Sequence, residues 1–409
     1  MQTNLAEQFK NTADGDEAEA ILRACVHCGF CTATCPTYQL LGDELDGPRG
    51  RIYLIKQVLE GQPATQRTQL HLDRCLSCRN CESTCPSGVQ YGRLLDIGRK
   101  VVEQQVPRPA GQRYQRLLLK EALPRKWIFR PAMKAGRLLR PLLPKALQEK
   151  VQALPAMRAW PRGGQSRKML LLDGCVQPDM APNINGAAAR ILAALDVELV
   201  VAPRAGCCGA IRYHLADHDG GLDDMRRNID AWWPLLEAGA EAIVMTASGC
   251  GATVKEYGHL LRHDAVYALK AQRVSELTRD ISEILCDEQQ GLLALLKQRP
   301  TQEPVAFHPP CTLQHAQRIR GKVEDLLRSI GVDVRLCGDS HLCCGSAGTY
   351  SLLQPELSHQ LRDRKLSALQ ATGATRIVSA NIGCQSHLQS GTTLPVGHWI
   401  ELIDQMLKP

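Results

Sequence analysis

The distribution of apolar residues divides the chain into parts with different patterns. From residue 168 onward, short runs of β-branched and aliphatic residues alternate with longer segments in which apolar residues recur every three or four positions. The short runs predict strands at 169–172, 197–201, 242–246, 305–307, 332–336 and 376–380. The longer segments predict helices over 185–195, 225–237 and 313–330. Regular alternation of strands and helices is typical of α/β layers with mostly parallel sheets.

The first 106 residues carry only the helical pattern. Helices are predicted over 16–24, 49–60 and 91–105. The apolar set of the middle helix is Ile52, Leu54, Ile55, Val58 and Leu59. We therefore expect a multidomain protein of α+β and α/β class, with a helical domain over 1–106 and two α/β domains over 168–290 and 303–409.

The segment 107–167 is predicted to be a basic, proline-rich linker. Residues 108–168 hold sixteen lysines and arginines against Glu121 and Glu149, whereas the whole chain has a net charge of only +7. Apolar groups such as 127–129 and 138–139 alternate with these charges. A basic amphipathic stretch suits an anionic membrane surface. A solvated linker and docking to an acidic partner subunit remain alternatives; nucleic acid is not expected, because aromatic residues make up only 4% of the chain.

Two cysteine runs in the helical part carry the clearest chemical signal. Cys25, Cys28, Cys31 and Cys35 are followed by Pro36, and the run recurs fifty positions later. The second run consists of Cys75, Cys78, Cys81, Cys85 and Pro86. This is the spacing of bacterial two-cluster ferredoxins, in which the fourth cysteine serves the other cluster. A structural zinc site needs only four thiolates and does not explain the duplication. The runs predict two [4Fe–4S] clusters and an electron carrier.

Arg49 and Arg51 lie between the two runs. Either they offset the negative charge of the clusters or they face solvent.

The α/β part contains a second duplication. Its cysteines are Cys175, Cys207, Cys208 and Cys250 in one copy, and Cys311, Cys343, Cys344 and Cys384 in the other. The offset is 136 residues for three pairs and 134 for the last, which indicates an internal repeat. Each set follows predicted strands, where open α/β sheets bind ligands. Four converging thiolates suit zinc or an iron–sulfur cluster equally well; buried, reduced cysteines that pack as small apolar residues are the alternative.

Two cysteines and one histidine lie outside these two sets. Cys286 and Cys337 fall outside both sets and are expected to be incidental thiols. His387 stands three residues after Cys384, where a metal ligand could fall, but the first copy has Thr253 at the matching position.

The chain shows no motif for a redox coenzyme of its own. It has no Gly-x-Gly-x-x-Gly after a predicted strand, no phosphate-binding loop and no arrangement typical of a Ser/His/Asp triad. We therefore expect neither flavin nor NAD on this chain, and something else must supply its electrons. The first ten residues have no apolar stretch, and no run of about 18 apolar residues occurs. With so many cysteines, these features favour a reducing, cytoplasmic location.

Taken together, the two ferredoxin runs and the two Cys…Cys-Cys-Gly…Cys repeats resemble the heterodisulfide-reductase-D/glycerol-3-phosphate-dehydrogenase-C superfamily. Residues 23–44, 228–234 and 341–350 are especially similar to the iron–sulfur subunits of bacterial glycolate oxidases. The resemblance implies one cluster on Cys25, Cys28, Cys31 and Cys85. It implies the other on Cys75, Cys78, Cys81 and Cys35.

The same resemblance implies a role in a complex. A flavoprotein subunit would oxidise glycolate to glyoxylate, and this chain would pass the electrons to a quinone-type acceptor, without being catalytic alone. The complex would be peripheral, on the cytoplasmic side of the inner membrane. The same electron role for lactate or glycerol 3-phosphate is an alternative, as is a thiol/disulfide reductase. Members of the superfamily often have a further cysteine where this chain has Thr253 and His387, and its absence argues against a disulfide-reducing cluster.

Overall fold

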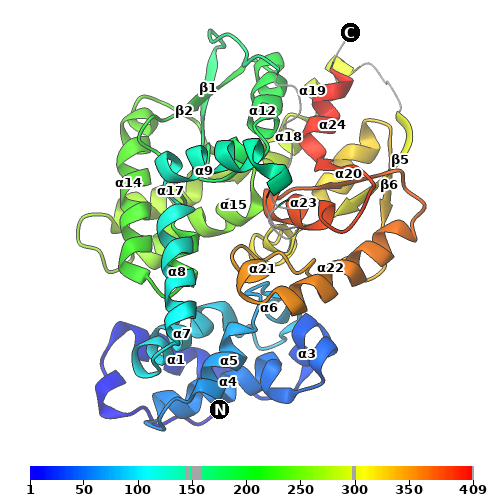
Figure 1. Cartoon of the computed structure of the whole chain (residues 1–409). Coiled ribbons are helices and arrows are strands. Elements are labelled where there is room, and N and C mark those ends of the chain that lie inside the picture. The colour runs from blue at the N-terminus through cyan, green and yellow to red at the C-terminus, as the bar shows by residue number, and fades with distance from the viewer. Residues whose placement is uncertain (143–147, 149–157, 297–300, 408–409) are drawn as a thin grey trace.

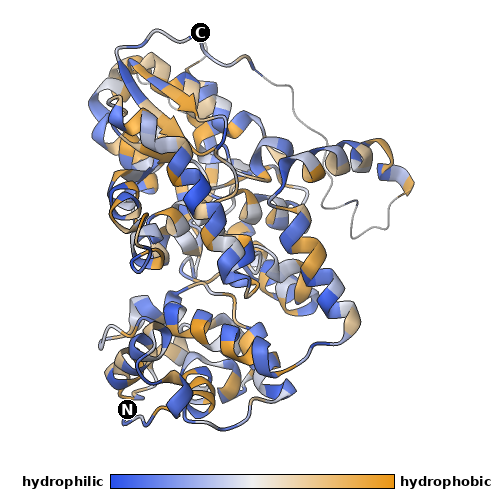
Figure 2. Ribbon diagram, turned by 90° about the vertical axis from the view of Figure 1, so that its left-hand side faces the viewer, coloured by the Kyte–Doolittle hydropathy of each residue, from blue (hydrophilic) through white to orange (hydrophobic). Residues whose placement is uncertain are grey.

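The computed structural model describes residues 1–142, 148, 158–296 and 301–407. Figure 1 shows the helical N-terminal part below two α/β domains that lie side by side. The strands in Figure 2 are coloured mainly apolar, whereas most helices carry both polar and apolar residues. This difference is expected where helices cover a parallel sheet that is buried on both faces.

The helical domain is built from seven α-helices within residues 13–105. They are α1 (Ala13–Ala24), α2 (Phe30–Ala33), α3 (Pro36–Leu41), α4 (Pro48–Leu59), α5 (Gln66–Asp73), α6 (Asn80–Thr84) and α7 (Tyr91–Gln105), with short 3₁₀ turns η1 (Glu7–Phe9) and η2 (Glu44–Asp46). The three predicted helices are therefore confirmed. Helix α4 starts at Pro48, in the position where a missing N–H costs nothing. It buries four of its five predicted apolar residues against the domain core, and Leu54 is only half-buried.

The basic segment is more regular than a linker. It forms α8 (Ala110–Ala122) and α9 (Lys126–Leu138), followed by η3 (Arg140–Leu142). Pro109 and Pro124 lie outside α8 and α9, Pro131 lies inside α9, and Pro141 lies inside η3. In Figure 1, α8 rises from the helical domain towards the first α/β domain. Lys145, Lys150, Glu149, Pro144 and Pro155 lie outside the described residues.

Two four-stranded parallel sheets have the same strand order. The first is β2-β1-β3-β4 and the second is β6-β5-β7-β8. Their bounds are β1 (Arg167–Leu171), β2 (Val197–Val201), β3 (Ile243–Met245), β4 (Thr278–Asp280), β5 (Thr301–His308), β6 (Val332–Leu336), β7 (Arg376–Ser379) and β8 (Val396–His398). All six predicted strands are confirmed. The sequence pattern missed β4 and β8, because each is a three-residue edge strand with too few apolar positions to show a period.

The helices around these sheets confirm two of the three predicted helices and contradict the third. They are α11 (Gln177–Met180), α12 (Asn183–Ala194), α13 (Ala210–His214), α14 (His218–Glu237), α15 (Ser248–Val254), α16 (Tyr257–Leu260), α17 (Ala268–Leu277), α18 (Ile281–Asp287), α19 (Gln289–Leu296), α20 (Lys322–Ser329), α21 (Tyr350–Leu353), α22 (Pro355–Gln370), α23 (Ile382–Gln389) and α24 (Trp399–Met406). The continuous helix predicted over 313–330 is wrong. A π-helical turn, η4 (Thr312–Ala316), is separated from α20 by Arg318 and Gly321, both with positive φ.

The two α/β domains share one large hydrophobic cluster, and each domain also has a smaller cluster of its own. The largest buried cluster contains Ile184 and Ile191 of the first domain together with Phe307 and Ile400 of the second. Helices α12 and α24 pack against each other across the boundary, where Arg190 pairs with Asp404 at 2.8 Å. The repeats therefore stabilise each other and do not behave as independent units.

Because this core is continuous, truncating Ile400 should destabilise both repeats. The side chain is fully buried. We expect Ile400→Ala to lower the free energy of unfolding by about 2–5 kcal/mol, measured by anaerobic denaturant unfolding with probes in each repeat. The control is Leu269→Ala, which removes a side chain that is 82% exposed and should change stability by less than about 0.5 kcal/mol. A loss confined to the second repeat would contradict a shared core.

Candidate iron–sulfur sites

The two ferredoxin loops have the same backbone. His27 and Gly29 in the first loop have φ values of 55° and 86°, and Ser77 and Arg79 in the second have 53° and 56°. These left-handed residues stand at equivalent positions, fifty residues apart, and they fold each loop tightly between its first three cysteines. The repeated spacing thus produces a repeated conformation, even at Ser77 and Arg79, where a left-handed backbone is unfavourable.

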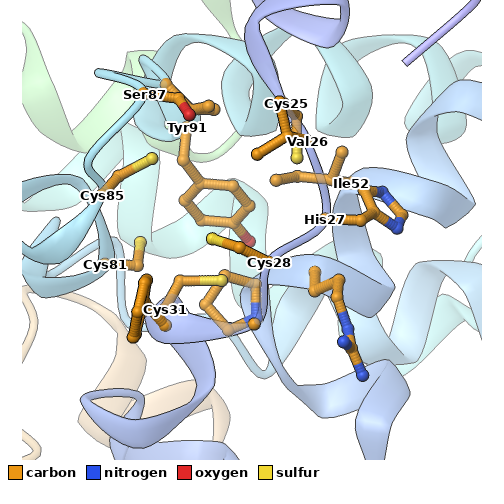
Figure 3. Close-up of a pocket in the computed structure, with 15 residues that line it drawn as sticks. Cys25, Val26, His27, Cys28, Cys31, Ile52, Cys81, Cys85, Ser87 and Tyr91 are labelled. Carbon is orange, nitrogen blue, oxygen red and sulfur yellow. The ribbon is translucent and has the colours of Figure 1, made fainter.

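One group of cysteines surrounds a pocket of about 430 Å³ of empty space, part of it open to solvent. Cys25, Cys28 and Cys31 of the first loop line it together with Cys85 of the second (Figure 3). Cys81 also borders it. Cys28 is exposed. We call this the cluster-1 site.

The remaining ferredoxin cysteines gather in a more buried place, which we call the cluster-2 site. Burial raises the pKa of the Cys81 thiol, and the nearby Cys78, Cys75 and Cys35 raise it further. Burial likewise raises the pKa of Cys78. Thiols in such surroundings resist ionisation until a metal takes the place of their protons. The donor sets at both sites thus suit thiolate-bound iron–sulfur clusters.

The structure distinguishes the two arginines between the runs. Arg51 is 1% exposed and donates to the backbone carbonyl of His71 at 2.7 Å. Burial acts to lower its pKa, but the neighbouring Cys75 and other acidic groups raise it overall, so the guanidinium stays charged beside the cluster-2 site. Arg49 borders the cluster-1 site, is 38% exposed and pairs with Glu44 at 2.6 Å. Only Arg51 is therefore a buried counter-charge.

Tyr91 is a site residue that the sequence did not reveal. Its hydroxyl donates to Cys75 Sγ at 3.6 Å, while its ring lines the cluster-1 site (Figure 3). The side chain is 4% exposed, and it therefore bridges both sites inside the protein. Its position at the start of α7, six residues after Cys85, was the only available signal.

The cysteines of each α/β domain come together after the strands, as expected. Seven of the eight are buried and Cys250 is half-buried. Cys311 Sγ lies 3.9 Å from Cys343 Sγ. Sulfur contacts also join Cys343 to Cys344 and Cys344 to Cys384, and the first domain repeats this chain of contacts.

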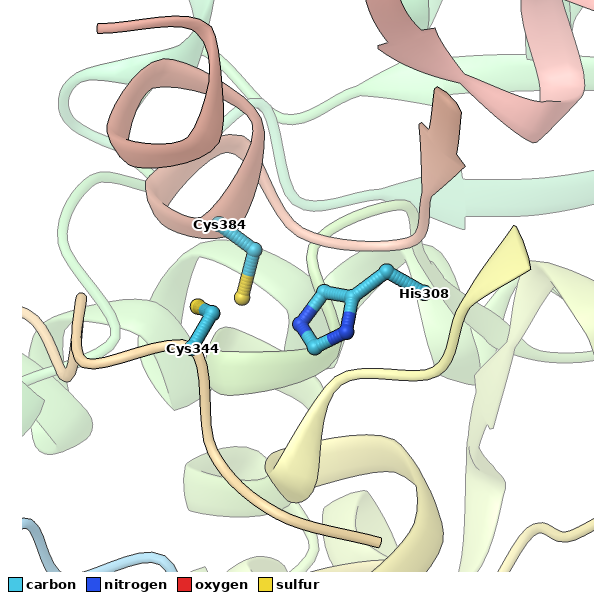
Figure 4. Close-up of side chains that lie close together, drawn as sticks. All are labelled: His308, Cys344 and Cys384. Atoms are coloured by element: carbon cyan, nitrogen blue, oxygen red, sulfur yellow. The ribbon is translucent and has the colours of Figure 1, made fainter. Parts of the chain in front are cut away.

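The second α/β domain also brings a histidine to its cysteines. Donor atoms of His308, Cys344 and Cys384 lie within 4.8 Å of one another (Figure 4). His387, three residues after Cys384, does not belong to this group, and its Nε2 lies 3.0 Å from Ser358 Oγ. The only sequence signal for His308 was its place in His-Pro-Pro-Cys.

A second close group of donors, Asp43, Asp46 and His71, lies in the helical domain. Asp46 already contacts Arg51, Arg74 and His71, so its carboxylate has little capacity left for an ion.

The cluster-2 loop lies directly against the second α/β domain. Leu76 and Cys78 belong to the same apolar cluster as Cys311 and Cys343. Asn80 Nδ2 donates to the carbonyl of His341 at 3.2 Å across this contact. The cluster-2 site and the cysteine site of the second α/β domain are therefore neighbours.

No helix in the described ranges is both long and apolar enough to span a membrane.

This arrangement, a helical two-loop cysteine domain beside paired cysteine-rich α/β domains, defines an iron–sulfur protein of the electron-transfer class. The 4Fe-4S dicluster domain family matches residues 21–89, and the CCG cysteine-rich domain family matches 169–255 and 305–389. The dicluster match supports two [4Fe–4S] clusters.

Comparison with known proteins identifies the family more closely. The chain is 55% identical over 410 residues, the whole of both chains, to the glycolate oxidase iron-sulfur subunit of Escherichia coli. It is 30% identical to the probable glycolate oxidase iron-sulfur subunit of Bacillus subtilis, over 95% of this chain and 92% of that one. Lactate utilization protein A of Bacillus licheniformis is 26% identical over 53% of this chain and 88% of its own length. The chain belongs to the family of glycolate oxidase iron–sulfur subunits.

The contact between Tyr91 and Cys75 predicts an effect on the reduction potential. A hydrogen bond to a ligating sulfur stabilises the more negative, reduced state. Tyr91→Phe should therefore lower one potential by roughly 20–65 mV, equivalent to a hydrogen bond of about 0.5–1.5 kcal/mol, in a redox titration followed by electron paramagnetic resonance. Tyr53→Phe, at a side chain that is 46% exposed, should leave both potentials unchanged. An unchanged titration in Tyr91→Phe would show that the hydroxyl does not act on the cluster.

Proposed function

We propose that this chain is the electron-transfer subunit of a glycolate-oxidising complex. A flavoprotein subunit removes two electrons from glycolate to give glyoxylate, and this chain passes them singly to a quinone-type acceptor. The observation that carries the proposal is the identity of 55% along the full length of a glycolate oxidase iron-sulfur subunit. Bound [4Fe–4S] clusters would supply one-electron chemistry, and hydride removal from the substrate is assigned to the flavin of the partner.

The proposed ligand sets cross between the two loops. Cys25, Cys28, Cys31 and Cys85 would hold one cluster, which is supported by their common place around the cluster-1 site. Cys75, Cys78, Cys81 and Cys35 would hold the other, supported by the mutual effects on their thiol pKa values. Arg51 would supply the buried positive counter-charge at this second site.

Exchange of electrons with a partner subunit is assigned to the cluster-1 face. Cys28 is exposed there, and the flanking Val26 and Phe30 are 67% and 62% exposed. Two such apolar side chains beside a cysteine ligand offer a surface on which a partner can exclude water close to the cluster. The cluster-2 site is covered by the second α/β domain and offers no comparable approach.

A reconstituted complex tests the proposal directly. The purified chain alone should not reduce a dye with glycolate, and addition of the flavoprotein should restore glycolate-dependent reduction of a quinone analogue. Cys28→Ser or Cys78→Ser should abolish transfer beyond the flavin while flavin reduction by glycolate continues. D-lactate and glycerol 3-phosphate serve as competing donors, since faster reduction with either one would reassign the substrate. Dye reduction by the flavin-free chain alone would favour a catalytic thiol/disulfide role.

The cysteines of the two α/β domains are proposed to bind metal as well, either zinc or an iron–sulfur cluster. Their burial and their repeated chains of sulfur contacts support metal binding. Iron, sulfide and zinc counts on the anaerobically purified complex distinguish the two.

Attachment to the cytoplasmic face of the inner membrane is assigned to the surface of α8, α9 and η3. At least eight of the sixteen basic side chains are already ion-paired within the protein, for example Lys126 with Asp173 and Arg130 with Asp179. The exposed apolar side chains on these helices include Tyr114, Trp127 and Leu138. Membrane binding would therefore depend on apolar insertion as much as on charge.

A double substitution tests this surface. Lys134 has no ion pair among the described residues, and Trp127 is 74% exposed. Lys134→Glu with Trp127→Ser should weaken binding to anionic vesicles at least about fivefold, because one well-placed cation contributes about 1 kcal/mol. Co-sedimentation measures the effect, and high salt should reduce wild-type binding. Leu269→Ser is the matched exposed control. Undiminished binding of the double variant would place attachment in another subunit.

A further inference from the structure

His308 is buried in an unusual way. The side chain stands at the end of β5 and is 1% exposed. Neither ring nitrogen has a hydrogen-bond partner among the described residues. A polar group buried without a partner is costly, so an unpartnered buried imidazole indicates a ligand that occupies its nitrogen.

The imidazole is directed at two sulfurs. Figure 4 shows the His308 ring reaching towards Cys344 and Cys384. The donor atoms of all three residues lie within 4.8 Å of one another. Ligands of a tetrahedral zinc ion, with bonds of 2.0–2.3 Å, stand about 3.3–3.8 Å apart, so only a small adjustment would close this site around one ion.

The short distances between the donor atoms of His308, Cys344 and Cys384 disfavour an iron–sulfur cluster at this site. Four irons and four sulfides hold the cysteine sulfurs of a cubane further apart than the ligands of a single ion. In agreement, no three of the eight ferredoxin cysteines, all within the described ranges, come as close together as His308, Cys344 and Cys384 do.

The four cysteines of the second domain, although joined by a chain of sulfur contacts, pack in two different apolar clusters. Cys344 and Cys384 belong to one apolar cluster, with Ile377 and Leu388. Cys311 and Cys343 belong to another, beside Leu76 of the cluster-2 loop. The pair next to His308 is therefore the one that faces away from the ferredoxin domain.

The first repeat lacks this arrangement. The constant offset of 136 residues places Leu172 at the position of His308. Leucine offers no donor, and among the described residues no three donors of the first repeat come within 4.8 Å of one another. The duplication has therefore diverged at the one position that would complete a mixed nitrogen–sulfur site.

Charge balance favours a divalent ion here. Binding of Zn²⁺ by a neutral imidazole and two thiols releases two protons and leaves a centre with no net charge. A neutral centre avoids the cost of burying a charge. Imidazole with thiolate ligands is also a donor set typical of zinc.

We propose that the second α/β domain holds one zinc ion bound by His308, Cys344 and Cys384, with a fourth position left to a further ligand. The first repeat has no equivalent site with a histidine ligand, so any metal that its four cysteines hold would be bound by sulfur. This inference deepens the metal binding proposed for the α/β domains and is independent of the electron-transfer role.

The test compares the metal content and metal coordination of the wild type and a variant. Both are used as full chains that have been purified anaerobically and treated with a chelator. The wild-type protein should retain about one zinc ion, with X-ray absorption at the zinc edge showing one nitrogen and at least two sulfur ligands. His308→Leu reproduces the first repeat and should lower the zinc content by about one ion per chain relative to the wild type. The electron paramagnetic resonance of the ferredoxin clusters should remain, which separates this result from any failure of the electron-transfer proposal.

Two further variants guard against a folding defect. His308→Cys offers another zinc ligand and should restore zinc, with one nitrogen replaced by sulfur in the absorption spectrum. His263→Leu, at an exposed histidine outside the site, should leave zinc unchanged. Zinc retained in His308→Leu with an unaltered spectrum would overturn the proposal. So would a zinc-free wild-type chain that holds more iron than two cubane clusters account for.

Discussion

The helical domain depends on one constraint: buried thiols from two loops, fifty residues apart in sequence, must share the same small volumes. Burial raises the pKa of Cys31 to about 11 and also raises that of Cys81, and the neighbouring thiols add to the effect. Buried thiols such as these do not ionise readily in an apolar interior unless metal ions replace their protons. Folding of this domain and loading of its clusters are therefore expected to be coupled.

The remaining architecture supports this arrangement. Helices α4 and α7 hold the two loops together, and the second α/β domain closes over the cluster-2 loop through Leu76 and Cys78. The shared core and the Arg190–Asp404 pair keep both repeats in one body, so this cover has a fixed position. Cys28, at the cluster-1 site, is the exposed cysteine among the eight ferredoxin cysteines. The two ferredoxin sites therefore differ in access: one has an exposed cysteine, and the other is covered by the second α/β domain.

Most of the fold was predictable from the sequence because its signals are local and repeated. The spacing within each ferredoxin run and the apolar strands depend on residues close in the chain, and the constant offset of the α/β cysteines shows as a repeat in the sequence itself. The errors arise where local signals are weak. Strands β4 and β8 are too short to show a period, and positive φ at Arg318 and Gly321 breaks a segment whose apolar spacing looks helical.

The parts of the sites that escaped prediction depend on tertiary contacts. Tyr91 meets Cys75 only because α7 folds back on the second loop, and burial of Arg51 depends on the packing of α4. His308 joins Cys344 and Cys384 from three separate strand ends, so its role could not be read from a spacing.

The central claim is that the two cluster sites exchange their fourth cysteines, and paired substitutions test it most directly. The account predicts that Cys28→Ser with Cys85→Ser, both at the cluster-1 site, removes one cluster and leaves about four ferredoxin irons per chain. Cys28→Ser with Cys35→Ser should damage both clusters and leave far less iron and no intact cubane signal. Iron and sulfide counts with electron paramagnetic resonance give the readout. The reverse pattern, with one cluster surviving in Cys28→Ser/Cys35→Ser and none in Cys28→Ser/Cys85→Ser, would contradict the account.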